Sequence, residues 1–214
     1  MAAKSEVYKG EPIRSGALWI ALVAEIVSFG IVLTAVTLAG QGHIVLSEPW
    51  LSLYQLLVRW TAAMPAISTL CLLFWIFRAN KNARALSIQS LATRSLENSA
   101  GWAVGWFFVP VANLWKPFEV MREIYKASRT PHDWRKAQGA SIVGWWWAIH
   151  IFGNLFSVFL IILKSEGNPI TDREMAMAFY AVVIVHQTLL FVITTRIVKW
   201  QAKAHRLGGI ENVF

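Results

Sequence analysis

Four stretches of the chain are apolar enough and long enough to cross a membrane. They cover residues 17–39, 56–78, 141–163 and 176–198. Each has the roughly 20 residues that an α-helix needs to cross about 30 Å of hydrocarbon at about 1.5 Å per residue. The pattern predicts an all-α integral membrane protein with four transmembrane helices, which form a single membrane domain over residues 1–214.

Two shorter segments between the second and third spans have a different pattern. Residues 102–115 are apolar but number only about 14, too few for an ordinary crossing. They also contain Pro110 and Asn113, so we expect a short re-entrant or interfacial segment. Residues 118–127 mix apolar and charged positions at helical spacing, which predicts an amphipathic helix on the cytoplasmic surface.

The positions of lysine and arginine predict the orientation of these spans. Seventeen of the 20 cations lie in four segments, residues 1–16, 78–94, 116–136 and 196–206. Because short cytoplasmic loops carry an excess of Lys and Arg, we expect both termini on the cytoplasmic side. A crossing by residues 102–115 would carry the six cations that follow to the outside, so this segment is expected to enter and return.

The overall composition agrees with a membrane protein and argues against several other classes. Hydrophobic residues make up 56% and charged residues 15% of the chain, a surplus of apolar surface that must face lipid. The net charge of +8 flanks the spans, which favours topology control and anionic lipid headgroups over nucleic acid as the partner. The single cysteine, Cys71, excludes an intramolecular disulfide.

Sequence motifs of enzymes are not found in the forms that a single sequence can test. The chain has no HExxH, no Walker-type glycine loop and no GxSxG. Its loop carboxylates are scattered on both sides of the predicted membrane. We therefore expect no enzymatic activity, no metal site and no cofactor.

Several polar residues fall within the predicted spans. Glu25 lies well inside the first span, and an ionisable residue at such depth is a candidate functional site by default. One interpretation is a protonatable site on a polar path that would also include Asn154. The other is a neutral glutamic acid whose hydrogen bonds join helices.

His150 and His186 lie near the midpoints of the third and fourth spans. Two neutral imidazoles at equal depth could ligate one b-type haem, with Asn154 fixing the tautomer of His150. Alternatively, each imidazole makes structural polar contacts inside the bundle.

Two motifs carry a resemblance to a known family. The first is RANKNA at residues 78–83, and the second is GWAVGWFFVPVANLWKP at residues 101–117. With them the chain resembles bacterial integral membrane proteins classified as a domain of unknown function. The resemblance implies a multi-pass protein of the bacterial cytoplasmic (inner) membrane and supplies no activity. Its signature residues here are Arg78, Asn80, Asn82, Pro110, Asn113, Trp115 and Pro117.

The two motifs invite a structural hypothesis. Pro110 lacks an amide donor, and the chain around it cannot be regular helix, so its backbone groups need partners. The polar side chains of Arg78, Asn80 and Asn82 would supply them and thereby join the motifs. The same Pro110–Asn113 turn would otherwise serve as a filter-like turn or as an interfacial anchor.

Three functions follow from these patterns. The favoured one is a non-enzymatic subunit, scaffold or lipid-contacting accessory that acts through its cytoplasmic face, with a membrane protein partner or as a homo-oligomer. The alternatives are a small channel or proton-coupled transporter that uses Glu25 and the Pro110–Asn113 turn, and a haem b electron-transfer subunit. The predicted lipid-headgroup contacts are Arg84, Lys116, Arg122 and Lys126.

Overall fold

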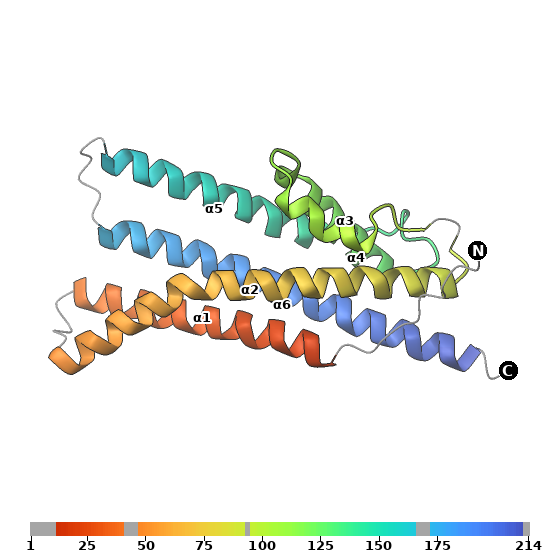
Figure 1. The fold of residues 1–214 in the computed structure, drawn as a ribbon, viewed down its shortest axis with the longest axis horizontal. Helices are drawn as coiled ribbons and strands as arrows, with labels where there is room; N and C mark the ends of the chain where they lie inside the picture. Colours follow the sequence, from red (N-terminus) through yellow and green to blue (C-terminus); the bar gives the residue numbers. More distant parts are fainter. Residues whose placement is uncertain (1–11, 41–46, 93–94, 166–171, 212–214) are drawn as a thin grey trace. The chain divides into compact units, whose positions relative to one another are not determined.

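The structure is a computed structural model that describes residues 12–40, 47–92, 95–165 and 172–211. Over these residues the chain forms helices and turns and contains no strand (Figure 1). The all-α fold predicted from the sequence is therefore confirmed.

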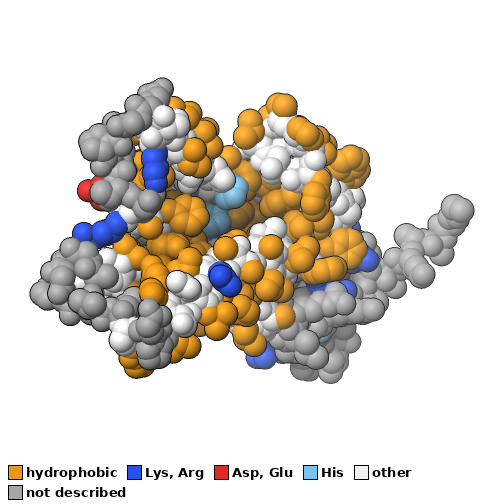
Figure 2. Space-filling view, turned by 60° about the vertical axis from the view of Figure 1, so that its left-hand side comes forward, with side chains coloured by type: hydrophobic (Ala, Val, Ile, Leu, Met, Phe, Trp, Pro, Cys, Tyr) orange, Lys and Arg blue, Asp and Glu red, His pale blue; other side chains and the backbone are white. Residues whose placement is uncertain are grey.

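Four long helices carry the apolar stretches of the chain. They are α1 (Pro12–Gly40), α2 (Glu48–Gln89), α5 (Ser141–Ser165) and α6 (Asp172–Glu211). All four are long and apolar enough to cross a membrane, which confirms the prediction of four candidate spans. Large hydrophobic side chains on them face outward, and Figure 2 shows a face covered mostly by such side chains with few charges.

All four helices extend beyond the predicted spans, and two of them, α2 and α6, do so by more than a dozen residues. At 1.5 Å per residue, α2 and α6 each reach about 60 Å, twice the thickness of the hydrocarbon core. Residues 79–89 of α2 contain neither glycine nor proline, so the helix continues into charged sequence. Pro65 lies inside α2, where it removes one backbone hydrogen bond of the helix.

The segment between α2 and α5 contains the short elements. These are α3 (Ala100–Gly105), the 3-10 turns η1 (Trp106–Phe108) and η2 (Ala112–Leu114), and α4 (Lys116–Arg129). The expected short segment 102–115 is thus a turn of helix followed by two 3-10 turns, and its depth in a bilayer stays a prediction. The expected surface helix 118–127 lies within α4.

The chain divides into two compact units, and each long helix contributes to both. The first unit comprises residues 1–18, 70–145 and 191–214, of which the structure describes the ranges given above. Its core includes Trp75, Ile76, Met121 and Ile197, all almost fully buried.

The second unit comprises residues 19–69 and 146–190. Each of its four helical segments is about 20 residues long, the length that crosses the hydrocarbon core. Glycine allows a close approach between α5 and α6 in this unit, because a Cβ added at Gly153 would lie 2.9 Å from Cγ1 of Val182. Small residues at such points are typical of helix packing in membranes.

Candidate functional site

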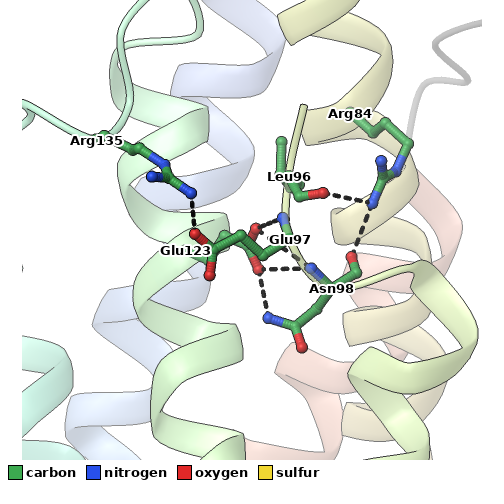
Figure 3. Close-up of polar contacts among 6 residues, drawn as sticks. All are labelled: Arg84, Leu96, Glu97, Asn98, Glu123 and Arg135. Atoms are coloured by element: carbon green, nitrogen blue, oxygen red, sulfur yellow. Dashed lines mark hydrogen bonds and ion pairs between the residues drawn. The ribbon is translucent and has the colours of Figure 1, made fainter. Parts of the chain in front are cut away.

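Glu123 of α4 is the centre of a polar network in the first unit. Its side chain is only 4% exposed, although it is a carboxylate on an amphipathic helix. It accepts hydrogen bonds from the backbone N–H groups of Glu97 and Asn98, and from Nδ2 of Asn98 at 2.7 Å (Figure 3). Burial raises the pKa of this carboxyl above its ordinary value, while the donated hydrogen bonds act in the opposite direction.

Glu97 and Asn98 lie in the loop between α2 and α3, and side chains of α2 also hold this loop. Nη2 of Arg84 donates to the carbonyl oxygens of Leu96, at 3.2 Å, and Asn98, at 2.9 Å (Figure 3). Nδ2 of Asn80 donates to the same Asn98 carbonyl at 3.1 Å. These donors satisfy carbonyl oxygens that have no partner in a helix or strand. The loop is thereby fixed between α2 and α4.

Asn98 also connects this loop to the second sequence motif. Its Oδ1 accepts a hydrogen bond from Nε1 of Trp106 at 3.0 Å. Asn80, Arg84, Asn98, Trp106 and Glu123 therefore form one connected set, which we call the signature network. It joins residues of the RANKNA region, the GW motif and α4.

A second buried contact fastens α6 to the same region. Nε2 of Gln201 donates to the carbonyl oxygen of Ala79 at 3.0 Å and to Oγ of Ser128 at 2.9 Å. Its Oε1 accepts from Nδ2 of Asn82 at 3.4 Å. The amide of Gln201 thus holds α2, α4 and α6 together, with Asn82 and Gln201 both almost fully buried.

The hypothesis that Asn80 and Asn82 join the two motifs through the backbone near Pro110 needs correction, whereas the part assigned to Arg78 stays a prediction. The Nδ2 groups of Asn80 and Asn82 bond to Asn98 and Gln201 instead. The backbone of the turn satisfies itself, because Asn113 N–H donates to Val109 and Ala112 N–H to Pro110. The motifs do meet, but through Asn98 and the indole of Trp106.

Pro110, Asn113, Trp115 and Pro117 lie in the turn that leads into α4 and at the start of that helix. Val111, between Pro110 and Asn113, has φ of 65°, a left-handed conformation that a β-branched residue rarely adopts. Trp115 is exposed and precedes α4, and Pro117 is buried in the first turn of that helix, where its missing N–H costs no helix bond.

The four cations predicted to meet lipid headgroups have different surroundings. Nη2 of the half-buried Arg84 donates to the carbonyls of Leu96 and Asn98, a structural role beside which its headgroup contact stays a prediction. Lys116 pairs with Glu119 at 2.6 Å. Arg122 is exposed and Lys126 is half-buried, and no carboxylate of the described residues lies within ion-pair distance of either.

The intramembrane candidate Glu25 lies in the interior of the second unit. It is 1% exposed, and its Oε1 accepts a hydrogen bond from Nε2 of Gln187 on α6 at 2.8 Å. Ser68 of α2 also bonds to this carboxyl. Oε2 of Glu25 and Oε1 of Gln187 are buried without a partner in the described part of the chain.

The two histidines come together in the second unit, with ring centroids 5.3 Å apart and planes inclined by 36°. His186 also stacks on Trp146 and His150 on Trp147, at 5.7 and 4.7 Å. An axial pair needs one nitrogen on each side of a porphyrin, whereas these rings pack against each other and against indoles. The arrangement does not fit a haem between them. Nδ2 of Asn154 donates to the backbone oxygen of His150 at 2.7 Å and also lies 3.5 Å from Nε2 of the His150 ring.

The positions of Glu123 and Gln201 on buried helix stripes could have been recognised from the sequence, although a hydropathy average does not show them. Glu123 falls three residues after Val120 and four before Ala127, so it lies on the buried stripe of α4. Gln201 follows Ile197 by four residues on the buried stripe of α6. A polar residue on an apolar stripe signals a buried hydrogen-bond centre, because an unpaired one would be costly.

The fold and the signature network define an all-α protein with four candidate membrane spans, in which a loop and a short amphipathic helix are fixed by buried polar contacts. The chain belongs to the family described as a domain of unknown function, DUF4328, whose family model matches residues 51–202. Searches of curated proteins and of solved structures gave no match. The matched range contains the signature network and Gln201, and Glu25 lies outside it.

Proposed function

We propose that this chain is a non-enzymatic accessory protein of the bacterial cytoplasmic membrane, with both termini cytoplasmic. It contacts lipid and a membrane protein partner, or a second copy of itself, through its cytoplasmic face. The observation that carries the proposal is a group of exposed apolar side chains in residues 102–115, directly before the charged helix α4. We call it the apolar tip; its members are Trp102, Phe108, Val111, Leu114 and Trp115.

The exposure of the apolar tip argues for contact with lipid. Phe108 is 70% exposed, Val111 68% and Leu114 58%. Fully burying side chains of this size stabilises by about 1.5–3 kcal/mol each, so leaving three of them in water is unfavourable. Next to cations, such a group is typical of segments that lie at the headgroup boundary.

The fixed backbone around the apolar tip supports the same proposal. The 3-10 turns satisfy their own backbone groups, and Trp106 is bonded to Asn98 of the signature network. The tip is thus held in one conformation, so little conformational entropy is lost when it meets a surface.

The proposal is tested by single-cysteine labelling in a Cys71→Ser background, which removes the only native thiol. A nitroxide at Val111→Cys in phosphatidylethanolamine and phosphatidylglycerol vesicles should collide with oxygen and be shielded from a polar nickel chelate. The matched control is Gln89→Cys, an exposed polar site at the end of α2, which should show the reverse. Equal nickel access at both sites would overturn the proposed lipid contact.

The same control variant tests the orientation. A membrane-impermeant maleimide should label Gln89→Cys in inverted membrane vesicles and leave it unlabelled in intact spheroplasts. Labelling in spheroplasts would place this end of α2 outside and overturn the cytoplasmic assignment.

A second candidate function, proton-coupled transport, is favoured by the contacts of Glu25. Oε2 of Glu25 and Oε1 of Gln187 are buried acceptor atoms without a hydrogen-bond partner in the described part of the chain, and a proton on the Glu25 carboxyl would remove its charge from this interior. The carbonyls of Pro110, Val111 and Ala112 each accept a local hydrogen bond, so this candidate rests on Glu25 rather than on the Pro110–Asn113 turn. Proton flux into proteoliposomes should be lost in Glu25→Gln and kept in Asn154→Ala; equal flux in Glu25→Gln would remove this candidate.

A further inference from the structure

A cavity with an entirely positive charged lining lies beside α4 in the first unit. Its volume is about 510 Å³, and it is bounded by α4, by the loop of residues 135–140 and by the first turn of α5. We call it the basic cavity. Its charged lining residues are Arg122, Lys126, Arg135 and Lys136, and no aspartate or glutamate of the described residues lines it.

Two of these four cations, Arg122 and Lys126, form no ion pair with a carboxylate of the described residues, although both also line the neighbouring hollow that contains Glu97, Glu119 and Glu123. Arg135 pairs with Glu97, and Lys136 pairs with Asp133 at 2.9 Å. Arg122 and Lys126 lie one turn apart on α4, a spacing at which like charges repel. Burial, together with the neighbouring Arg122, lowers the pKa of the Lys126 ammonium. An anion between these two side chains would remove the repulsion.

The loop at the edge of the basic cavity is held in a fixed shape. Gly139 has φ of 84°, which favours glycine, and a Cβ there would lie 2.7 Å from Nη1 of Arg129. The same nitrogen donates to the carbonyl oxygen of Gln138 at 3.0 Å. Arg129 therefore shapes the loop that leads into α5 and keeps the cavity open on this side.

The beginning of α5 adds to the positive field in the basic cavity. Ser141, the first residue of this 25-residue helix, lines the cavity, and the first turn of α5 contains no acidic residue. The free N–H groups and the partial positive charge of a helix N-terminus favour anions, phosphate above all. Here they supplement Arg122 and Lys126, the two lining cations that make no direct ion pair within the described residues.

We propose that the basic cavity binds a phosphate group between Arg122, Lys126 and the first turn of α5. A planar guanidinium, an ammonium and backbone N–H groups match the several acceptor oxygens of a phosphate better than the two of a carboxylate. The volume leaves room for more than a bare phosphate, such as a glycerophosphate. Phe118 adds an apolar wall opposite the loop. The phosphate can come from a phospholipid headgroup or from a soluble ester; the lipid source rests on the proposed function.

The test measures binding to the purified full chain in a zwitterionic detergent by native mass spectrometry and by thermal shift. The probes are phosphatidylglycerol, soluble glycerol 3-phosphate, and oleate as an anionic lipid without phosphate. We expect phosphatidylglycerol to bind and oleate to bind at least tenfold more weakly. Binding of glycerol 3-phosphate as tightly as the lipid would support the site with a soluble source. Equal binding of oleate, or no binding of either phosphate compound, would overturn the proposal.

Variants then locate the binding. The double variant Arg122→Ala, Lys126→Ala should weaken binding by about 100-fold, since it removes two charge-assisted contacts. The matched control is Lys199→Ala, Lys203→Ala, which removes two exposed cations at the same helical spacing on α6 and should change binding less than threefold.

The exchange Arg122→Lys, Lys126→Arg keeps both charges and should retain binding, which separates loss of the site from loss of folding. Unchanged binding in the alanine pair would overturn the proposal. Because the label at Val111 reports lipid contact of the apolar tip independently, failure here and failure of the proposed function are distinguishable.

Discussion

Replacing Glu123 by alanine is expected to loosen the whole segment between α2 and α5. The substitution leaves three donors without their acceptor, two backbone N–H groups and the side-chain amide of Asn98. A buried donor without a partner costs about 1–3 kcal/mol, and part of that cost is recovered where water enters the loop. We therefore expect a loss of roughly 3 kcal/mol, which for a chain of this size corresponds to a fall in Tm of roughly 6–12 °C.

The assay is thermal unfolding of the purified chain in mild detergent, followed by tryptophan fluorescence, with hydrogen exchange resolved by peptide. Residues 95–106 should exchange faster in Glu123→Ala, because both the loop and Trp106 lose their anchor. The matched control is Glu119→Ala, an exposed carboxylate on the same helix that pairs only with Lys116. Loss of this exposed ion pair should lower the free energy of unfolding by at most about 1 kcal/mol. A Tm of Glu123→Ala equal to that of Glu119→Ala would refute the reasoning.

The remaining predictions concern pH and two helix contacts. Because burial raises the folded-state pKa of Glu123, its contribution to stability is fullest below the ordinary carboxyl value of about 4.5 and is lost as pH rises through the raised value. The Tm of the wild type should therefore fall relative to Glu123→Gln as the pH rises above about 4.5, and a constant difference would contradict this. Gln201→Ala should cost about 2–4 kcal/mol in detergent unfolding, against less than about 0.5 kcal/mol for the exposed Lys203→Ala. Gly153→Ala should cost about 1–3 kcal/mol because its Cβ would meet Val182, whereas Gly30→Ala, with open space around it, should be neutral or slightly stabilising. Equal Tm values for the two glycine variants would count against the close helix approach.

The hydropathy pattern was sufficient for the four long helices, because an apolar run of about 20 residues has few other places to fold. It could not give the ends of α2 and α6, since charged residues with good helix propensity extend a helix without any apolar signal. The same limit explains why the hydrogen bonds of Arg84 to the loop could not be predicted from the sequence. Charge counting treats all cations alike, whereas the carbonyl oxygens that Arg84 binds belong to a loop whose path is set by tertiary contacts.

The meeting of the two motifs could be predicted only in part. Their residue types indicated a hydrogen-bonded junction, yet the partner was assigned to the turn at Pro110 on the assumption that its backbone stays unpaired. Local bonds occupy part of that backbone: Ala112 N–H donates to the Pro110 carbonyl two residues earlier, and Asn113 N–H to the Val109 carbonyl four residues earlier. The true connector, Asn98, lies in a loop that has no hydropathy signature, and Glu123 is only one of several charged residues in the amphipathic pattern of residues 118–127. A polar residue on an apolar stripe was the overlooked clue.

The buried state of the signature network has a consequence for comparing members of this family. Asn80, Arg84 and Glu123 all bond to Asn98 in the loop between α2 and α3, so relatives that share these residues are expected to share this scaffold. The positions left open to outside molecules, such as Arg122 and Lys126, make no bond that the scaffold requires. Diversification among relatives should then be sought on the outward rows of α4 and in the loop before α5. Two proteins with the same motif can differ there in what they bind.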